Sequence, residues 1–497
     1  MEVLLRIDPL SSEALHRQLY DAVRTAILTG RLRPGDKLPA TRVLAEQLSL
    51  SRTTVAEAYD QLQAEGYILG KHGSGTYVAP DLPEDASLAV NGRVHVRRSA
   101  EQPSFSQWGQ KIVSGEYLHL ARPEEPGDVE FDFRPHRIDG DRFPWQTWNS
   151  AVERALEHAR EGLLRYPPSG GYPELLTQIA THIARHRGVN CFPEQIAIVN
   201  GTQQGLNLIA ELLLQPGDHV AVEDPGYPAA RLVFGTRGLQ VTYVPVDGEG
   251  MEVDRLVHRQ DIKLVHVTPS HQEPTGATLS LGRRLALLDW AERSWCVVLE
   301  DDYDSEFRYE GRPIESLQGL DSSGLVVYAG TFSKSVLPGL RIGFVVLPDH
   351  LVQPFVMAKS LWDSGTSVME QAALAEFMAS GEYERHIRRM RRIYRDKRDL
   401  LVTALQRCFG SHVLVGQRHG GLNVLVQFNL PYSEQEIVLR AGAAGVYLQP
   451  GSRYFAQRHD PPIFLLGFGG PAANRIEAGV TRLASALVPA TQSSPVA

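Results

Sequence analysis

Apolar strand-like runs alternate with amphipathic helical stretches from Val129 onward, and this alternation limits the possible folds more than any other feature. Five of these runs end in a loop that opens with polar, glycine or proline residues: IAIVNG, HVAVEDPGY, IKLVHVTPS, CVVLEDDYD and LVVYAGT. Strands separated by helices pair in parallel, and helices cover both faces of such a sheet. The sequence therefore predicts an α/β domain over 129–497, with functional loops at the carboxyl ends of its strands.

The beginning of the chain carries the pattern of three helices and a short hairpin. Ser11 or Ser12 is expected to cap the first helix, Thr41 a short second helix and Ser51 a third. Only Ser49-Leu50 separates the last two, which is the tight spacing of a helix-turn-helix. The segments YIL and TYV then enclose the turn KHGSG, which predicts a wing.

The third helix presents Arg52, Thr53 and Thr54 outward in its first turn, where a recognition helix contacts base edges. The alternative is a plain helical bundle whose polar cluster is only a solvated cap. We predict a winged helix-turn-helix DNA-binding domain over 1–79. A linker is predicted over 80–128, because its first part carries three prolines and no sustained period.

Charge and cysteine content limit the setting in which the chain works. The net charge of −8 argues against wholesale coating of nucleic acid, so any DNA binding must come from a local surface. The three cysteines are far apart, which fits a reducing cytosol. The first residues lack a secretory pattern and no run of 18 apolar residues occurs, so we predict a cytoplasmic protein without membrane contact.

A lysine stands in a loop of small and hydroxyl-bearing residues, GTFSKSVLPGLRIG, directly after the run LVVYA. A lysine in such a loop suits a phosphorylated aldehyde, with which Lys334 forms a Schiff base while Thr331, Ser333 and Arg341 hold the phosphate. The alternative is an ordinary loop lysine beside a structural arginine.

Two upstream segments fit the same ligand. Gly201, Thr202 and Gln203 open a helix directly after a strand, where backbone N–H groups and the helix dipole bind an anion. Tyr227 offers a flat ring for stacking on a heteroaromatic ligand. The alternatives are an ordinary helix start and a tyrosine that packs over its own loop.

Carboxylates gather at a strand end in VVLEDDYDSEF. One acid there is able to pair with a ring nitrogen, and the spacing leaves both Asp301 and Glu300 open for this role. Tyr303 is placed to hydrogen-bond a ring hydroxyl. Acids at a strand end also serve as metal ligands, but no histidine-rich set accompanies these, so we predict no metal site.

Three resemblances agree with these readings of the motifs. The segment DKLPATRVLAEQLSLSRTTVAEAYDQLQAEGYILGKHGSGTYV resembles the winged-helix domain of GntR-type bacterial regulators. The motifs of the large domain, in this order, resemble a fold-type I aminotransferase. Over nearly its full length the chain resembles the MocR subfamily of GntR-type regulators, through segments such as YPPSGGYPELLTQIATHIARHRGV and EDDYDSEFRYEGRP.

The MocR resemblance implies pyridoxal 5′-phosphate as the cofactor and operator DNA as a partner. It implies Lys334 as the lysine that binds the cofactor covalently, and Asp301 rather than Glu300 as the partner of the ring nitrogen. It implies that Tyr166 reaches the phosphate of the partner subunit in a homodimer, which we expect to be head-to-tail. The implied DNA contacts are Arg42, Ser51, Arg52, Thr53, Thr54, Lys71, His72 and Gly73.

Two departures bear on activity. Aminotransferases usually place an arginine for the substrate carboxylate in the final strand, where this chain has Leu465 in IFLLGFGG. Glu273 stands where enzymes have asparagine and regulators an aromatic residue. We therefore predict a regulator that senses a B6 vitamer, an amine or an amino acid, and not an enzyme. The alternative is an active aminotransferase with a DNA-binding head, for which Arg453 is a substitute anchor. Arg453 or Arg231 is also able to hold an amino-acid carboxylate from another direction.

Overall fold

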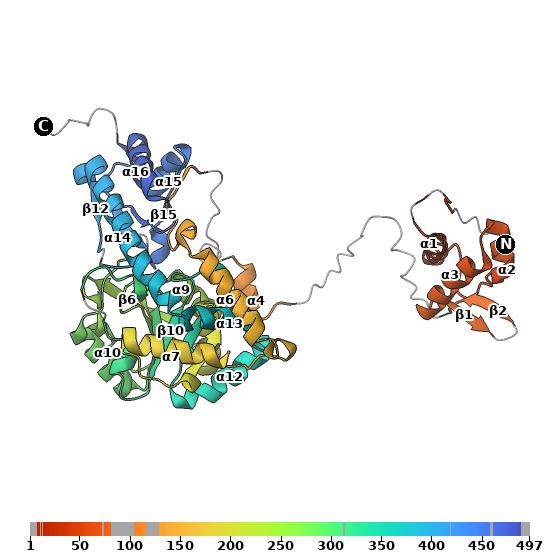
Figure 1. Cartoon of the computed structure of the whole chain (residues 1–497), viewed down its shortest axis with the longest axis horizontal. Helices are drawn as coiled ribbons and strands as arrows, with labels where there is room; N and C mark the ends of the chain where they lie inside the picture. Colours follow the sequence, from red (N-terminus) through yellow and green to blue (C-terminus); the bar gives the residue numbers. More distant parts are fainter. Residues whose placement is uncertain are drawn as a thin grey trace. The chain divides into compact units, whose positions relative to one another are not determined.

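The computed structural model describes residues 7–9, 11, 13–71, 74–80, 104–115, 129–311, 314–417, 419–457 and 461–488. The chain divides into two compact units, Met1–Ser104 and Phe105–Ala497, each of which is described by itself (Figure 1). None of the described helices has the length and apolar character needed to span a membrane.

Three helices and a two-stranded antiparallel hairpin form the first unit. Its elements are α1 (Leu15–Leu28), α2 (Thr41–Leu48), α3 (Arg52–Ala64), β1 (Ile68–Lys71) and β2 (Gly75–Val78). Leu19, Val55 and Leu62 are fully buried where α1 and α3 pack together. The predicted winged helix-turn-helix is confirmed.

One of the predicted helix caps is confirmed among the described residues, and Ser12 lies outside them. The Ser51 side chain accepts a hydrogen bond from the Thr54 backbone N–H at 3.0 Å, as predicted. Among the described residues, α1 and α2 begin after Ala14 and Ala40 without a side-chain cap. Capping by Thr41 is therefore wrong, because Thr41 is already the first helical residue.

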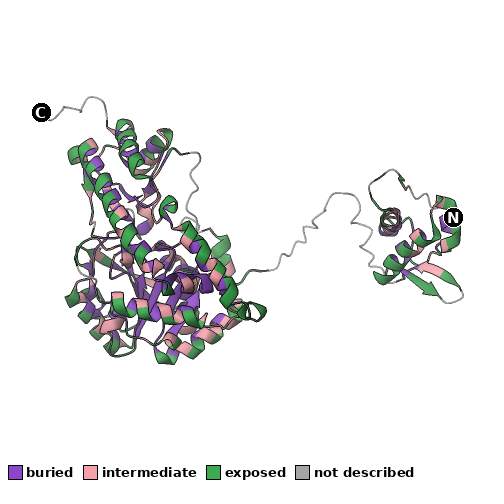
Figure 2. Cartoon of the chain, in the orientation of Figure 1, coloured by how far each residue is buried: buried purple, intermediate pink, exposed green. Residues whose placement is uncertain are grey.

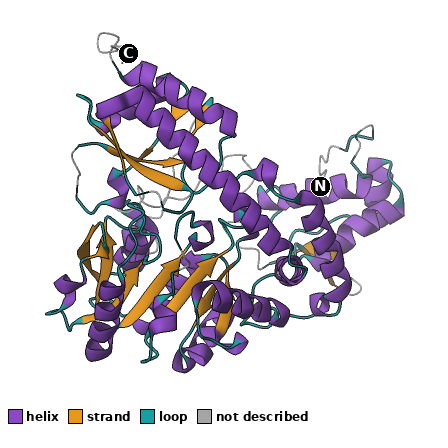
Figure 3. Cartoon of the chain, turned by 60° about the vertical axis from the view of Figure 1, so that its left-hand side comes forward, coloured by secondary structure: helices purple, strands orange, loops and turns teal. Residues whose placement is uncertain are grey.

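An eight-stranded sheet forms the centre of the second unit (Figure 3). Its spatial order is β4 (Ile196–Val199), β11 (Gly343–Val346), β10 (Val326–Thr331), β9 (Val297–Asp302), β8 (Ile262–Val267), β5 (His219–Asp224), β6 (Gln240–Asp247) and β7 (Gly250–Met251). The strands from β10 to β6 are parallel, and β11 and β7 run antiparallel to their neighbours. The predicted α/β architecture is confirmed.

Helices cover both faces of this sheet, so its central strands are buried on both sides (Figure 2). Every residue of β4, β9 and β10 is buried, which explains why these strands appear in the sequence as unbroken apolar runs. The helices around the sheet are α6 (Trp145–His158), α7 (Pro173–Arg187), α8 (Thr202–Leu213), α9 (Pro228–Thr236), α10 (Leu281–Ser294), α11 (Leu317–Leu320), α12 (Asp349–Asp363) and α13 (Val368–Ala379).

A smaller four-stranded antiparallel sheet follows, in the order β12 (Val413–Val415), β13 (Asn423–Phe428), β16 (Ile463–Gly467) and β15 (Gln449–Pro450). The long helix α14 (Glu382–Phe409) leads into it, and α15 (Glu434–Ala443) and α16 (Ala473–Leu487) accompany it. The short strands β3 (Phe131–Asp132) and β14 (Val446–Tyr447) pair in parallel.

Part of the stretch assigned to the linker belongs to the second unit. The helix α4 (Gln107–Val113) packs on α9, and Lys111 Nζ donates a hydrogen bond to the Gly235 carbonyl oxygen at 2.9 Å. The contacts place the division between Ser104 and Phe105, inside the range 80–128.

Candidate functional site

Lys334 lies in the loop between β10 and β11, and its side chain is largely enclosed. Burial lowers the pKa of Lys334, and the nearby carboxylates of Glu273 and Asp304 oppose this effect. A lysine with a lowered pKa is more often in the neutral amine form that attacks a carbonyl carbon.

The two acids that the spacing left open have different surroundings. Glu300 accepts backbone hydrogen bonds from Leu317 and Gln318 at the start of α11, and burial raises its pKa to about 7. Asp301 is 5 % exposed and faces His266, with 3.2 Å between Oδ2 and the ring Nε2. Its Oδ1 is buried and has no hydrogen-bond partner among the described residues. Since successive strand residues point to opposite faces, only one of the two acids can point into a given site.

The turn between β4 and α8 meets the lysine loop. Gly343 pairs with Thr331, and a Cβ built on Gly343 would lie 3.0 Å from the Thr202 backbone nitrogen. Arg341 Nη2 donates to the Asn200 carbonyl oxygen at 3.2 Å. A Cβ on Gly201 would lie 2.2 Å from the same Nη2, so only glycine leaves room for the arginine here.

This turn therefore brings an α8 N-terminus, hydroxyl groups and a guanidinium into one cradle. Ser333 contributes its backbone N–H, which donates to Thr331 Oγ1 at 3.2 Å, and the two hydroxyls are 3.1 Å apart. Helix N–H groups, hydroxyls and arginine are the groups that bind phosphate. Gln203 is exposed. The neighbouring Gln204 accepts a hydrogen bond from the Asn200 backbone N–H through its side-chain oxygen, at 2.7 Å.

Each of the two predicted tyrosines lies close to a histidine ring. The Tyr227 ring is nearly parallel to the His266 ring, with centroids 6.2 Å apart. Burial raises the pKa of Tyr227, and the charges of Arg341 and Arg453 lower it, which places both arginines within electrostatic range. The Tyr303 hydroxyl is 3.1 Å from His271 Nδ1.

The predicted DNA-contacting residues lie in the first unit. Ser51 begins α3, Arg52 and Thr53 are exposed in its first turn, and Thr54 is half-buried. Arg42 is exposed at the start of α2, where it pairs with Glu46 at 3.5 Å. Lys71 ends β1 and lies over the Tyr77 ring at 5.3 Å. The predicted contacts His72 and Gly73 lie outside the described residues.

Comparison with known proteins agrees with both units. Residues 15–78 match the bacterial regulatory proteins of the gntR family, and residues 139–459 match aminotransferase class I and II. The probable rhizopine catabolism regulatory protein MocR of Rhizobium meliloti is 36% identical over 490 residues, which cover 98% of this chain and 96% of MocR. The chain belongs to the MocR subfamily of GntR-type regulators.

Two further relatives extend this MocR-type assignment. The pyridoxine biosynthesis transcriptional regulator PdxR of Corynebacterium glutamicum is 30% identical, over 94% of each chain. The solved structure of LysN, an alpha-aminoadipate aminotransferase from Thermus thermophilus complexed with N-(5'-phosphopyridoxyl)-L-leucine, has a TM-score of 0.69 and 28% identity. It covers 77% of this chain and 97% of its own. These matches support pyridoxal 5′-phosphate as the cofactor of the MocR-type domain.

The side chain at position 465 of this MocR-type chain is buried. Leu465 lies in the middle of β16, is 1 % exposed, and pairs with Leu425 and Gln449 on the neighbouring strands. Arg231 is also buried, and its guanidinium donates to the Arg453 carbonyl oxygen. Leu465 therefore supplies no cation to a ligand, and Arg231 is held by the backbone of the segment between β15 and β16.

Glu273 forms a polar cluster that the sequence did not predict. It is 4 % exposed, and its Oε1 is 2.9 Å from His136 Nε2. The Asn423 side-chain Nδ2 is 3.1 Å from His136 Nδ1, the other nitrogen of that ring. His271 is bonded to Asp304 at 3.0 Å and approaches Tyr303. His271 is two residues before Glu273 in the sequence, whereas His136 and Asn423 carry no local signal.

Tyr166 is separate from these groups within its own chain. Its side chain is 90 % exposed in the loop before α7. A tyrosine so exposed is free to contact another molecule, and it contributes nothing to the phosphate cradle of the same subunit.

Proposed function

We propose that the chain is a DNA-binding transcriptional regulator whose aminotransferase-like domain binds pyridoxal 5′-phosphate and responds to it by changing its affinity for an operator. The carrying observation is that the chain has the phosphate cradle around Arg341, while a buried Leu465 stands where aminotransferases usually have an arginine. The groups that would hold the cofactor are present, and the arginine that would hold a substrate carboxylate is replaced. Because operators are chromosomal, we place the protein in the cytoplasm.

The residues of the site fit this cofactor. Asp301 Oδ1, buried and without a partner among the described residues, is available to the ring nitrogen. Gly201 leaves the space that keeps Arg341 at the cradle, where Thr202, Thr331 and Ser333 would hold the phosphate.

The other predicted site residues would each contact a different part of the cofactor or its phosphate. When bound, the cofactor supplies an electrophilic aldehyde and an electron-accepting ring. Lys334 would bind the aldehyde carbon, Tyr227 would cover one ring face, and Tyr303 would lie near the ring hydroxyl. Gly201 and Gln203 complete the start of α8, and Tyr166 reaches the phosphate of the partner subunit in a head-to-tail homodimer.

The proposed signal is the cofactor itself. An amino acid would need a cation for its carboxylate, and an apolar side chain at position 465 offers no donors. Arg231 donates one hydrogen bond to a backbone carbonyl, and Arg231 and Arg453 are the alternative anchors for an amino-acid carboxylate. We expect operator affinity of the apo-protein to change at least about fivefold on adding pyridoxal phosphate alone.

Operator binding of apo- and holo-protein tests this directly, with a DNA fragment selected from random sequence by the purified protein. A change that occurs only when an amine or amino acid is added to the holo-protein refutes B6 sensing and favours amine sensing. The competing function is an active aminotransferase with a DNA-binding head. Multiple turnovers with an amino donor and a keto acid would establish that function instead.

The DNA contacts are proposed for Arg42, Ser51, Arg52, Thr53, Thr54, Lys71, His72 and Gly73. We expect Arg52→Ala to weaken operator binding strongly, because base contacts contribute roughly 1–3 kcal/mol each and a dimer loses two. Arg17→Ala is the matched control, since Arg17 is an exposed arginine of α1 outside the helix-turn-helix. Equal operator affinity of Arg52→Ala and wild type would exclude α3 from this role.

A further inference from the structure

Two helices of the second unit bring a pair of histidines and a carboxylate together, away from the cradle. His182 and His186 are four residues apart on α7, so they lie on the same helix face. Glu384 comes from the first turn of α14. Its Oε1 is 2.8 Å from His182 Nδ1, and its Oε2 is 3.3 Å from His186 Nε2.

The cluster is held in place by its surroundings. The His182 ring packs edge-on against the fully buried Tyr383, with ring centroids 5.1 Å apart. The His182 side chain is 9 % exposed. The two imidazole rings are 4.7 Å apart. His186 Nε2 is buried and forms no hydrogen bond with a described group, although Glu384 Oε2 faces it at 3.3 Å. A buried ring nitrogen that forms no hydrogen bond is costly unless something else binds it.

An ordinary histidine–carboxylate pair elsewhere in the unit shows the difference. His158 Nδ1 is 2.8 Å from Glu376 Oε1, and Arg154 Nε donates to the other oxygen of that carboxylate at 3.1 Å. That pair is complete without an ion. In the α7–α14 cluster, both carboxylate oxygens face a ring nitrogen.

We propose that His182, His186 and Glu384 bind a divalent transition-metal ion, with Zn²⁺ the best fit. Two imidazole nitrogens and one carboxylate oxygen form a ligand set that zinc accepts, whereas Mg²⁺ and Ca²⁺ prefer oxygen ligands alone. The ligand atoms of the three residues all lie within 4.8 Å of one another, and the described residues contain no other such group. Three protein ligands leave a fourth position for water or a small molecule.

The protonation states favour this role. Metal ligation requires neutral imidazole and ionised carboxylate. Burial and the neighbouring His182 lower the pKa of His186, which favours its neutral form. The hydrogen bond between His182 Nδ1 and Glu384 would be replaced by coordination of the ion. The positive charges of Arg185 and Arg391 act on the same site and oppose cation binding. We therefore expect weaker binding than in a site without such neighbours.

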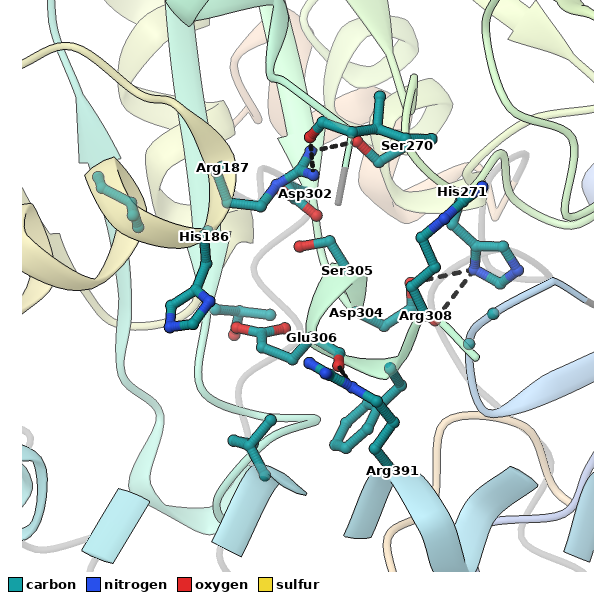
Figure 4. Close-up of a pocket in the computed structure, with 18 of the residues that line it drawn as sticks. His186, Arg187, Ser270, His271, Asp302, Asp304, Ser305, Glu306, Arg308 and Arg391 are labelled. Atoms are coloured by element: carbon teal, nitrogen blue, oxygen red, sulfur yellow. Dashed lines mark hydrogen bonds and ion pairs between the residues drawn. The ribbon is translucent and has the colours of Figure 1, made fainter. Parts of the chain in front are cut away.

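The cluster forms part of the wall of a cavity of about 230 Å³ (Figure 4). His186, Glu306 and Arg391 are among the side chains labelled around the cavity. The cavity wall also includes His271 and Thr331, which lie near the phosphate cradle. An ion here would join α7 to α14, the helix that continues to the four-stranded sheet. The cavity gives water or a small anion access to the open coordination position.

Metal binding by the untagged, full-length holo-protein tests the proposal. The protein is treated with a chelator and dialysed against Zn²⁺, and bound zinc is measured per chain; Co²⁺ then reports the ligand geometry through its visible absorption. We expect one ion per chain. His186→Ala and Glu384→Gln should each weaken binding by at least roughly tenfold, since even outer-shell changes cost that much. His158→Ala is the control and should bind like wild type.

Two results would overturn the proposal: wild-type protein that binds no ion, or a His186→Ala variant that binds as tightly as wild type. His186 is 37 % exposed, so its truncation leaves the core intact. Thermal unfolding and cofactor absorbance confirm that each variant is folded before its zinc content is compared.

Discussion

Replacing Gly201 by alanine should separate the cost of a strained backbone from the loss of cofactor binding. Gly201 precedes α8 with φ 80° and ψ 156°, a conformation that is essentially restricted to glycine. The added methyl group would lie 2.2 Å from Arg341 Nη2. The arginine must then move away from the cradle, because the backbone of a strand–helix turn cannot.

Both effects have an expected size. The backbone conformation costs of order 1–3 kcal/mol in the free energy of unfolding. Displacing Arg341 removes charge-assisted hydrogen bonds to the phosphate, each contributing about 1.5–3 kcal/mol. Since about 1.4 kcal/mol corresponds to a tenfold change, the Kd for pyridoxal phosphate should rise roughly ten- to a hundredfold.

The assay is titration of apo-protein with pyridoxal phosphate, followed by absorbance, together with thermal unfolding of the apo-protein. Gly217→Ala is the matched control, because Gly217 also has positive φ, at 93°, and no described heavy atom lies within 4 Å of the added Cβ. The control should lose stability and keep cofactor affinity. The reasoning is refuted if Gly201→Ala binds the cofactor like wild type, or if Gly217→Ala loses affinity equally.

Three further predictions use the same protein. Lys334→Ala should lose the cofactor label that borohydride fixes to the chain, measured by intact mass; a label of wild-type size would disprove the lysine assignment. Burial raises the pKa of Glu223 to about 7, above its unfolded value near 4.5, so between these pH values the folded state holds a proton that the unfolded chain releases. The free energy of unfolding should therefore fall by up to about 3 kcal/mol as the pH rises through this window. Glu223→Gln should flatten this part of the pH profile of thermal unfolding, and an unchanged slope would contradict the assignment. Leu62→Ala should destabilise the first unit by about 2–5 kcal/mol, since Leu62 is fully buried, and calorimetry should show an unchanged transition for the second unit.

Some properties were open to prediction because they depend on neighbouring residues in the chain. Strands β9 and β10 are buried on both faces, so their apolar runs are visible without any tertiary information. The Ser51 cap and the close spacing of α2 and α3 depend on a few successive residues, and so does the loop around Lys334. The order of these local patterns predicted both units, and its resemblance to known families implied the cofactor.

Other properties required the packed structure, because they depend on residues distant in sequence or on side-chain direction. Spacing did not separate Glu300 from Asp301, whereas the fold engages Glu300 with α11 and leaves one Asp301 oxygen without a described partner. His136 reaches Glu273 across 137 positions, and His182 reaches Glu384 across 202. The sequence determined which local elements form, and tertiary packing decided which side chains meet, because contact between distant residues is fixed only when helices and strands close around a common core.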